Sequence, residues 1–143
     1  PVNQLTMLEQ LGVFADKLPM PPDELPRLQD HRDQTADLAE RARSYLHANC
    51  SHCHRVWGGG NADFQLQADI SLDKTETINV APGRGKFGLN HAMIIAPGHP
   101  ERSVLLHRMQ LLGLGRMPHI ASGVVDDTGV AVVREWITEM DRE

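Results

Sequence analysis

The chain has 143 residues and a net charge of −5, and 41% of its residues are hydrophobic but only 4% aromatic. This length suits one globular domain with its own core, and the acidic balance argues against a nucleic-acid partner, which would favour a basic surface. No apolar run is long enough to span a bilayer, and two cysteines cannot form a disulfide scaffold. Because aromatic side chains usually dominate core burial, their scarcity indicates that something else helps to fill the interior.

The first 32 residues are expected to form an N-terminal lead-in outside the main domain. The chain begins at Pro1 without a signal peptide, so we interpret it as a processed product or as a fragment of a longer protein. An apolar stretch over residues 5–14 predicts a turn or two of helix. The prolines between positions 19 and 26 then rule out regular structure. The predicted organisation is therefore a Pro-rich lead-in over residues 1–32 and a folded domain over residues 33–143.

Helical patterns dominate residues 33–143. Apolar residues recur at spacings of three and four over residues 33–49, again from Pro100 to about residue 112, and finally from residue 126 or 127 to the chain end. Residues 55–96 are predicted to be mostly loop, with a short β-ribbon where apolar residues alternate over residues 64–72. A loop of that length is unusual in a compact domain unless it wraps around something. The prediction is a small all-α domain with long loops.

One motif carries specific chemistry: residues 50–54 read Cys-Ser-His-Cys-His, a C-x-x-C-H run at the end of the first good helix. This pattern is typical of the attachment site of a c-type haem. Cys50 and Cys53 can reach the two vinyl groups of a porphyrin and form thioethers, and His54 is then placed to ligate the iron. The second N–H of the His54 ring needs an acceptor, for which the sequence offers the carbonyl of Pro82 or a neighbour.

Two other uses of the cysteines fit the sequence less well. A thioredoxin-like dithiol would follow a strand in a βαβ context, and the sequence predicts neither. A structural zinc ion would need two further ligands at recognisable spacing, and no second C-x-x-C exists.

The second axial position of a haem iron is assigned to Met117. This methionine precedes Pro118 in a Gly-rich loop before the last helix, so it is not expected to be buried on the packed face of a helix. A His54/Met117 iron would have a raised reduction potential suited to electron transfer. Four other histidines keep bis-His ligation as an alternative, namely His91, His99, His107 and His119.

On these residues the chain resembles a class I-type cytochrome c domain. The helix before Cys50, the Met117-Pro118 pair and the C-terminal helix around Trp136 occur in the order of that family. The resemblance implies a small cytochrome c-like fold of about four to five helices with long loops around one haem. It also implies that Tyr45 and Trp136 lie where the first and last of these helices cross, with Ala42 permitting their approach.

A narrower resemblance covers most of the chain. Ala-Pro-Gly-x-Pro-Glu at residues 96–101 and Met117-Pro118 are similar to cytochrome domains of longer secreted bacterial proteins, including the so-called X183 modules. The resemblance implies structural roles near the haem edge for Pro97, Ser103 and Arg108. The glycine run at residues 58–60 departs from the pattern.

The expected function is therefore electron transfer by a non-enzymatic carrier domain with one covalent haem c, bound by Cys50, Cys53, His54 and Met117. Its partner would be a redox protein, for which the resemblance implies a carbohydrate-oxidising enzyme, and the domain itself would be monomeric within a longer protein. Covalent haem c implies a periplasmic or extracellular location. The alternatives are a haem enzyme or ligand sensor with a displaceable sixth ligand, and a module in which haem only supports the fold. Three arginines are candidates to meet the haem propionates, namely Arg55, Arg84 and Arg116.

Overall fold

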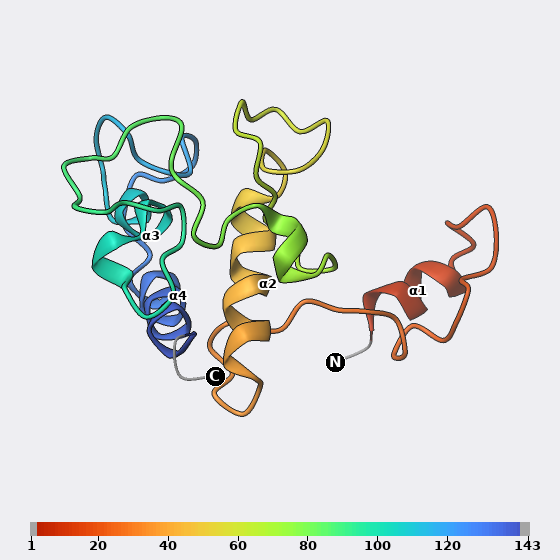
Figure 1. The fold of residues 1–143 in the computed structure, drawn as a ribbon. Coiled ribbons are helices and arrows are strands. Elements are labelled where there is room, and N and C mark those ends of the chain that lie inside the picture. The colour runs from red at the N-terminus through yellow and green to blue at the C-terminus, as the bar shows by residue number, and fades with distance from the viewer. Residues whose placement is uncertain (1–2, 141–143) are drawn as a thin grey trace.

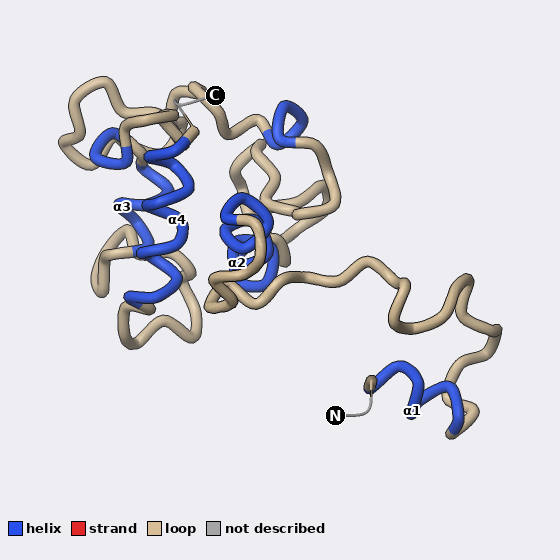
Figure 2. Tube along the Cα trace, turned by 90° about the horizontal axis from the view of Figure 1, so that it is seen from below, coloured by secondary structure: helices blue, strands red, loops and turns tan. Residues whose placement is uncertain are grey.

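The computed structural model describes residues 3–140, and within them the chain is helical, with no β-strand (Figures 1 and 2). This confirms the predicted all-α class. The α-helices and the short 3-10 helices η1 and η2 follow in the order α1 (Gln4–Gln10), α2 (Leu38–Cys50), η1 (Leu72–Thr75), η2 (Pro100–Arg102), α3 (Val104–Met109) and α4 (Asp127–Glu139).

The start of α2 is fixed by its N-cap. Asp37 accepts a hydrogen bond of 3.0 Å from the backbone N–H of Glu40, which satisfies one of the free donors of the first turn. The sequence predicted that this helix begins at residue 33. Asp33 instead closes a local turn by accepting from the backbone N–H of Thr35, and the helix begins five residues later.

Helix α4 begins where the sequence predicted, and it packs against α2. Asp126 is its N-cap and accepts from the backbone N–H of Gly129 at 3.1 Å. The ring of Tyr45, from α2, packs directly against Gly129, in the space that a Cβ would occupy. Ala42, also on α2, is fully buried in the same core. A small residue on each helix therefore lets the two backbones approach closely.

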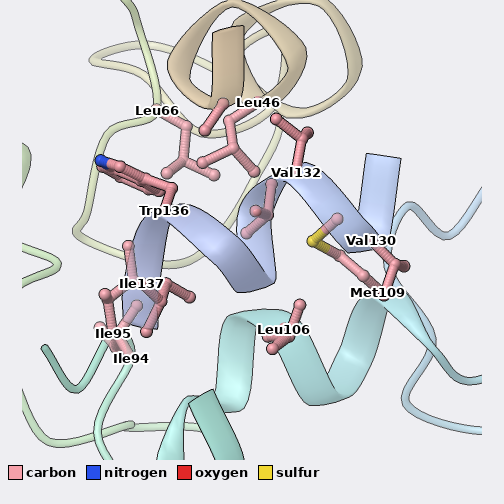
Figure 3. Close-up of a cluster of buried hydrophobic side chains, with 12 residues drawn as sticks. Leu46, Leu66, Ile94, Ile95, Leu106, Met109, Val130, Val132, Trp136 and Ile137 are labelled. Carbon is pink, nitrogen blue, oxygen red and sulfur yellow. The ribbon is translucent and has the colours of Figure 1, made fainter. Parts of the chain in front are cut away.

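The core lies between these helices and α3 (Figure 3). Leu46 of α2 points toward α4, the ring of Trp136 extends from α4 to one side, and Leu106 of α3 lies below α4. Several of these side chains are completely buried, including Ile95, Leu106, Val133 and Ile137. Each aliphatic side chain that is fully buried stabilises the folded state by about 1.5–3 kcal/mol relative to the same side chain left exposed.

Apart from η1, residues 55–99 form loops, and the predicted β-ribbon over residues 64–72 is wrong. The N–H of Gln65 donates to Thr75 O, in η1, at 2.8 Å, and the N–H of Leu66 donates to His54 O, in the turn after α2, at 2.9 Å. This segment therefore bonds to two different parts of the chain and not to a partner strand. Only isolated β-bridges occur in the described part of the chain, one of them between Ile78 and Ile95.

The helix predicted from Pro100 to about residue 112 is divided and shorter. Ser103 interrupts it with an extended backbone, because its hydroxyl accepts from the N–H of Ala96 at 2.9 Å and donates to His99 O at 3.1 Å. Helix α3 then ends at Met109.

The N-terminal segment stands away from α2–α4 in both views (Figures 1 and 2). Helix α1 buries none of its residues. The chain joins the core only further along, where the N–H of Gln29 donates to Ser44 Oγ at 2.9 Å and the guanidinium of Arg41 donates to His31 O. Among the described residues, no helix has the length and apolar character to cross a membrane.

Candidate cofactor site

The C-x-x-C-H motif is the turn that ends α2. The N–H groups of Cys53 and His54 both donate to Cys50 O, at 3.1 and 2.9 Å. This turn places Cys50, Cys53 and His54 along the wall of one cavity, and no disulfide joins the two thiols. Burial, and then the neighbouring Cys53, raises the pKa of the Cys50 thiol to about 12. A redox-active dithiol needs a lowered thiol pKa, so this environment does not favour thioredoxin-like chemistry.

The glycine run after the motif has a steric reason. The N–H of Gly60 donates to Cys53 O at 3.0 Å, and a Cβ on Gly60 would lie only 2.7 Å from that oxygen. A Cβ on Gly58 would also overlap the Cys53 carbonyl. The loop can fold back onto the motif because these two positions lack side chains. What the sequence presented as a departure from the family pattern therefore braces the motif.

His54 is buried, with 8% of its surface exposed, and its ring stacks on Phe64 at a centroid distance of 4.4 Å and an angle of 9°. Its Nδ1 is buried without a hydrogen-bond partner in the described structure. The prediction that the carbonyl of Pro82 or a neighbour accepts from this ring is therefore wrong. The ring orientation is set by stacking on Phe64 in place of the hydrogen bond that usually orients a ligating imidazole. Since Nδ1 is the buried nitrogen, a group in the cavity would meet the ring at Nε2.

The electrostatic surroundings keep His54 neutral. Burial lowers the pKa of its imidazole, and the positive charge of Arg108 lowers it further, as do His52 and His119. A neutral ring retains the lone pair that a metal ion requires. His54 therefore has the protonation state of a metal ligand without the help of a negatively charged neighbour.

Met117 lies on a loop that is tied to α3 at two points. Its N–H donates to Arg108 O at 3.0 Å, and Arg108 Nε donates to Gly115 O at 2.7 Å. Further along the loop, Arg116 Nε donates to Ser122 Oγ at 3.0 Å, and Ser122 Oγ donates to the carbonyl of Pro118. These bonds hold Met117 at the wall of the cavity that Cys50, Cys53 and His54 also line.

The cavity has a volume of about 940 Å³ and lies between the C-terminal end of α2, α3 and the long loops. In Figure 1 the loop after α2 (yellow) and the loop before α4 (blue) reach the same upper end of the molecule. The lining combines apolar side chains with a few charged ones. The apolar lining includes Phe64, Leu66, Val80, Ile94, Val104 and Leu105. All four residues selected from the sequence therefore line one space, although they come from segments more than sixty residues apart.

This space fits a haem in size and in chemistry. Its volume is at the upper end of the usual range for cofactor sites, and two thiols, a neutral imidazole and a thioether share its wall. No group of three or more His, Cys, Asp and Glu side chains that could hold a metal ion occurs in residues 3–140. The His/Met donor set of a haem iron does not need such a group.

Compared with models of protein families, with curated proteins and with solved structures, the chain matches none of them. The functional interpretation therefore rests on the geometry of the cavity.

Sequence reasoning placed the charged groups less well. Of the three arginines expected to meet haem propionates, Arg84 lines the cavity, whereas Arg55 and Arg116 do not. Arg108 lines it as well, although the resemblance assigned it only a structural role. Arg108 lies in the second half of the short helix α3, two residues after the buried Leu106, and no local pattern in the sequence indicates that its guanidinium faces a cavity.

Proposed function

We propose that the chain is an electron-transfer domain that binds one haem c covalently. Cys50 and Cys53 would form the thioethers, and His54 and Met117 would be the axial ligands. The observation that carries the proposal is the convergence of these four side chains on one cavity of suitable size. The resemblance to class I-type cytochromes c supports the finer fold assignment, because the motif ends α2 and Met117 precedes α4, the two helices that pack together.

Bound haem supplies a one-electron couple between ferric and ferrous iron. The chain's own residues would make this couple fast and reversible. His54 is neutral and held by Phe64, and Met117 is held by the bonds of its loop to α3. Ligands that are already in place need little rearrangement when the charge of the iron changes, so the residues supply rigidity and no bond-making chemistry.

Covalent attachment is tested by replacing the thiols. In the variant Cys50→Ala/Cys53→Ala, we expect loss of the haem that survives denaturation and acid extraction, which a haem stain of a denaturing gel detects. His52→Ala is the matched control, because His52 lies inside the motif but is exposed and has no role in attachment. Haem retained in the double variant, or lost equally in the control, would contradict the proposal.

Axial ligation is tested by Met117→Ala. We expect loss of the sulfur–iron charge-transfer absorption of the oxidised protein and a lower reduction potential. Met109 is the best control, since it also lines the cavity but packs beside Val130 in the core (Figure 3). Met109→Leu should keep the band, and a band that follows Met109 would refute the assignment of Met117.

The alternative with two histidine ligands has one specific observation in its favour. Of the four histidines considered, only His119 lines the cavity. If His119 is the ligand, His119→Ala removes low-spin ligation and Met117→Ala leaves the spectrum unchanged. A high-spin wild-type spectrum that shifts with cyanide or carbon monoxide would instead support a haem enzyme or sensor.

The proposal extends to location and partner. Covalent haem c is a product of export-coupled maturation, so a periplasmic or extracellular location accompanies it. The partner would be a redox protein, and the resemblance to modules of longer secreted proteins points to a carbohydrate-oxidising enzyme. The net charge of −5 favours a partner surface of opposite sign.

A further inference from the structure

Arg108 is a half-buried cation at the cavity wall without an acidic partner. The ion pairs found among residues 3–140 are His31 with Asp30 and His99 with Glu101, and neither involves an arginine. Burial lowers the pKa of the Arg108 guanidinium, so the charge is held in an unfavourable place. Charged groups withdrawn from water are costly unless an opposite charge or several hydrogen bonds compensate them.

The hydrogen bonds of Arg108 leave most of its donors available. Nε donates to Gly115 O at 2.7 Å, and no acceptor in the described residues is found for the two terminal nitrogens. The guanidinium lies 5.3 Å from the centre of the Phe87 ring, which supports its position without satisfying a donor. A planar group with free N–H donors beside an apolar cavity is suited to a carboxylate.

Arg108 also acts on both proposed axial ligands. Its backbone carbonyl accepts from the N–H of Met117 and its side chain holds Gly115, so it fixes the loop that carries the sixth ligand. On the other side, after burial, its positive charge is the largest cause of the lowered pKa of His54. Arg84 also lines the cavity but is exposed, and its one bond, to Asn61 O, is long at 3.4 Å.

We propose that the Arg108 guanidinium binds a haem propionate, and that this ion pair fixes the Met117 loop. Arg108 is thus a positioning residue that couples cofactor binding to sixth-ligand placement. This inference rests on the proposed function, because only a haem brings the propionate to the cavity. An ordered ion pair at this point would make the Met117 loop most rigid in the loaded protein.

The test compares three variants of the haem-loaded chain. Arg108→Gln removes the positive charge and the planar guanidinium with its paired N–H donors. Arg108→Lys keeps the charge but lacks the guanidinium. Arg116→Gln is the matched control, because Arg116 also braces the Met117 loop, through Ser122 and His119 O, but does not line the cavity. The readouts are the propionate-bending mode in resonance Raman spectra, the reduction potential, and the affinity of the ferric protein for imidazole, which competes with Met117.

In Arg108→Gln we expect a shifted propionate mode. The reduction potential should be lower, because loss of a positive charge favours ferric iron. The imidazole affinity should be about tenfold higher, because loss of a charged hydrogen bond loosens the Met117 loop. Arg108→Lys should shift the propionate mode while its potential stays closer to the wild type. Arg116→Gln should raise the imidazole affinity and lower the potential less than Arg108→Gln does, but leave the propionate mode unchanged. That combination distinguishes contact with the propionate from general support of the loop.

An unchanged propionate mode in Arg108→Gln overturns the inference and leaves the proposed function standing. The same conclusion follows if Arg116→Gln shifts the mode as much as Arg108→Gln does. If Arg108→Gln does not load haem, Arg108→Lys decides, and a wild-type mode in that variant overturns the inference. A wild-type chain without covalent haem overturns both the inference and the proposed function.

Discussion

Replacing Gly129 by alanine is expected to destabilise the fold, although alanine favours helices. Gly129 lies in the first turn of α4, where a Cβ would overlap Cζ, Cε2 and Oη of Tyr45, each closer than the 3.0 Å that real Cβ contacts keep. The Tyr45 ring cannot move away freely, because it packs edge-on against His31 at 5.1 Å and belongs to the partly buried layer around the core. Either α2 and α4 separate or the ring leaves its place.

The magnitude follows from two opposing terms. Overpacking of a core contact costs about 1–3 kcal/mol, and overlap with three ring atoms places this site toward the upper end. Alanine recovers about 0.8–1 kcal/mol of helix propensity relative to glycine. The expected net loss is therefore about 1–2 kcal/mol, which urea unfolding followed by circular dichroism can measure.

A second variant separates the two terms. In a Tyr45→Ala background the overlap is gone, so Gly129→Ala should there be neutral or stabilising by up to about 1 kcal/mol. Gly123→Ala serves as a control for a glycine replaced in open space, since no atom lies within 4 Å of its Cβ position. If Gly129→Ala stabilises the wild-type background as well, the close approach of α2 and α4 at this glycine is not a packing constraint and the reasoning fails.

The remaining predictions concern the loop behind the motif, the cap of α4 and the turn before α3. Gly60→Ala should lower the yield of covalent haem relative to Gly59→Ala, because only Gly60 would place a Cβ 2.7 Å from Cys53 O; equal yields in a haem stain would contradict this. Hydrogen bonds from Thr128 and from the N–H of Gly129 hold the pKa of Asp126 below its ordinary value of 3.8. The ionised Asp126 carboxylate therefore stabilises the fold above that pH, and this stabilisation is lost as the pH falls through the folded-state pKa. Asp126→Asn should keep most of the cap but reduce the loss of stability between about pH 6 and about pH 3, whereas Asp126→Ala should cost about 1 kcal/mol at the higher pH. Ser103→Ala should cost about 1–3 kcal/mol in urea unfolding, because it leaves the buried N–H of Ala96 without its acceptor, and a cost near zero would refute that role.

Local chemistry explains which features the sequence could predict. The C-x-x-C-H run, the start of α4 after its N-cap Asp126 and the position of Met117 on a loop all depend on neighbouring residues, and short-range patterns carry that information. The N-cap of α2 at Asp37 is also local, but Asp33, four residues earlier, carries the same side chain. Asp33 used its carboxylate for a turn, which the pattern alone did not distinguish.

The missed features are contacts between distant segments. Stacking of Phe64 on His54 depends on how residues 54–66 fold back, and the place of Arg108 at the cavity depends on the docking of α3 against α4. Gly129 is an unfavourable residue for a helix by its local propensity, and its reason is the Tyr45 ring that packs against it. Such tertiary contacts override local propensity, and a single sequence contains no direct signal for them.

The scarcity of aromatic residues now has a structural counterpart. The aliphatic core occupies the interface of α2, α3 and α4, while a cavity of about 940 Å³ lies beside it. Protein interiors are normally packed like organic crystals, so a space of this size lined by apolar side chains is costly unless a large apolar group occupies it. A ligand that binds only the folded chain raises its stability, and covalent attachment would make that gain permanent. Under the proposed function, the group that the Cys50–His54 motif attaches would also help to order the long loops of residues 55–99, which have little regular structure.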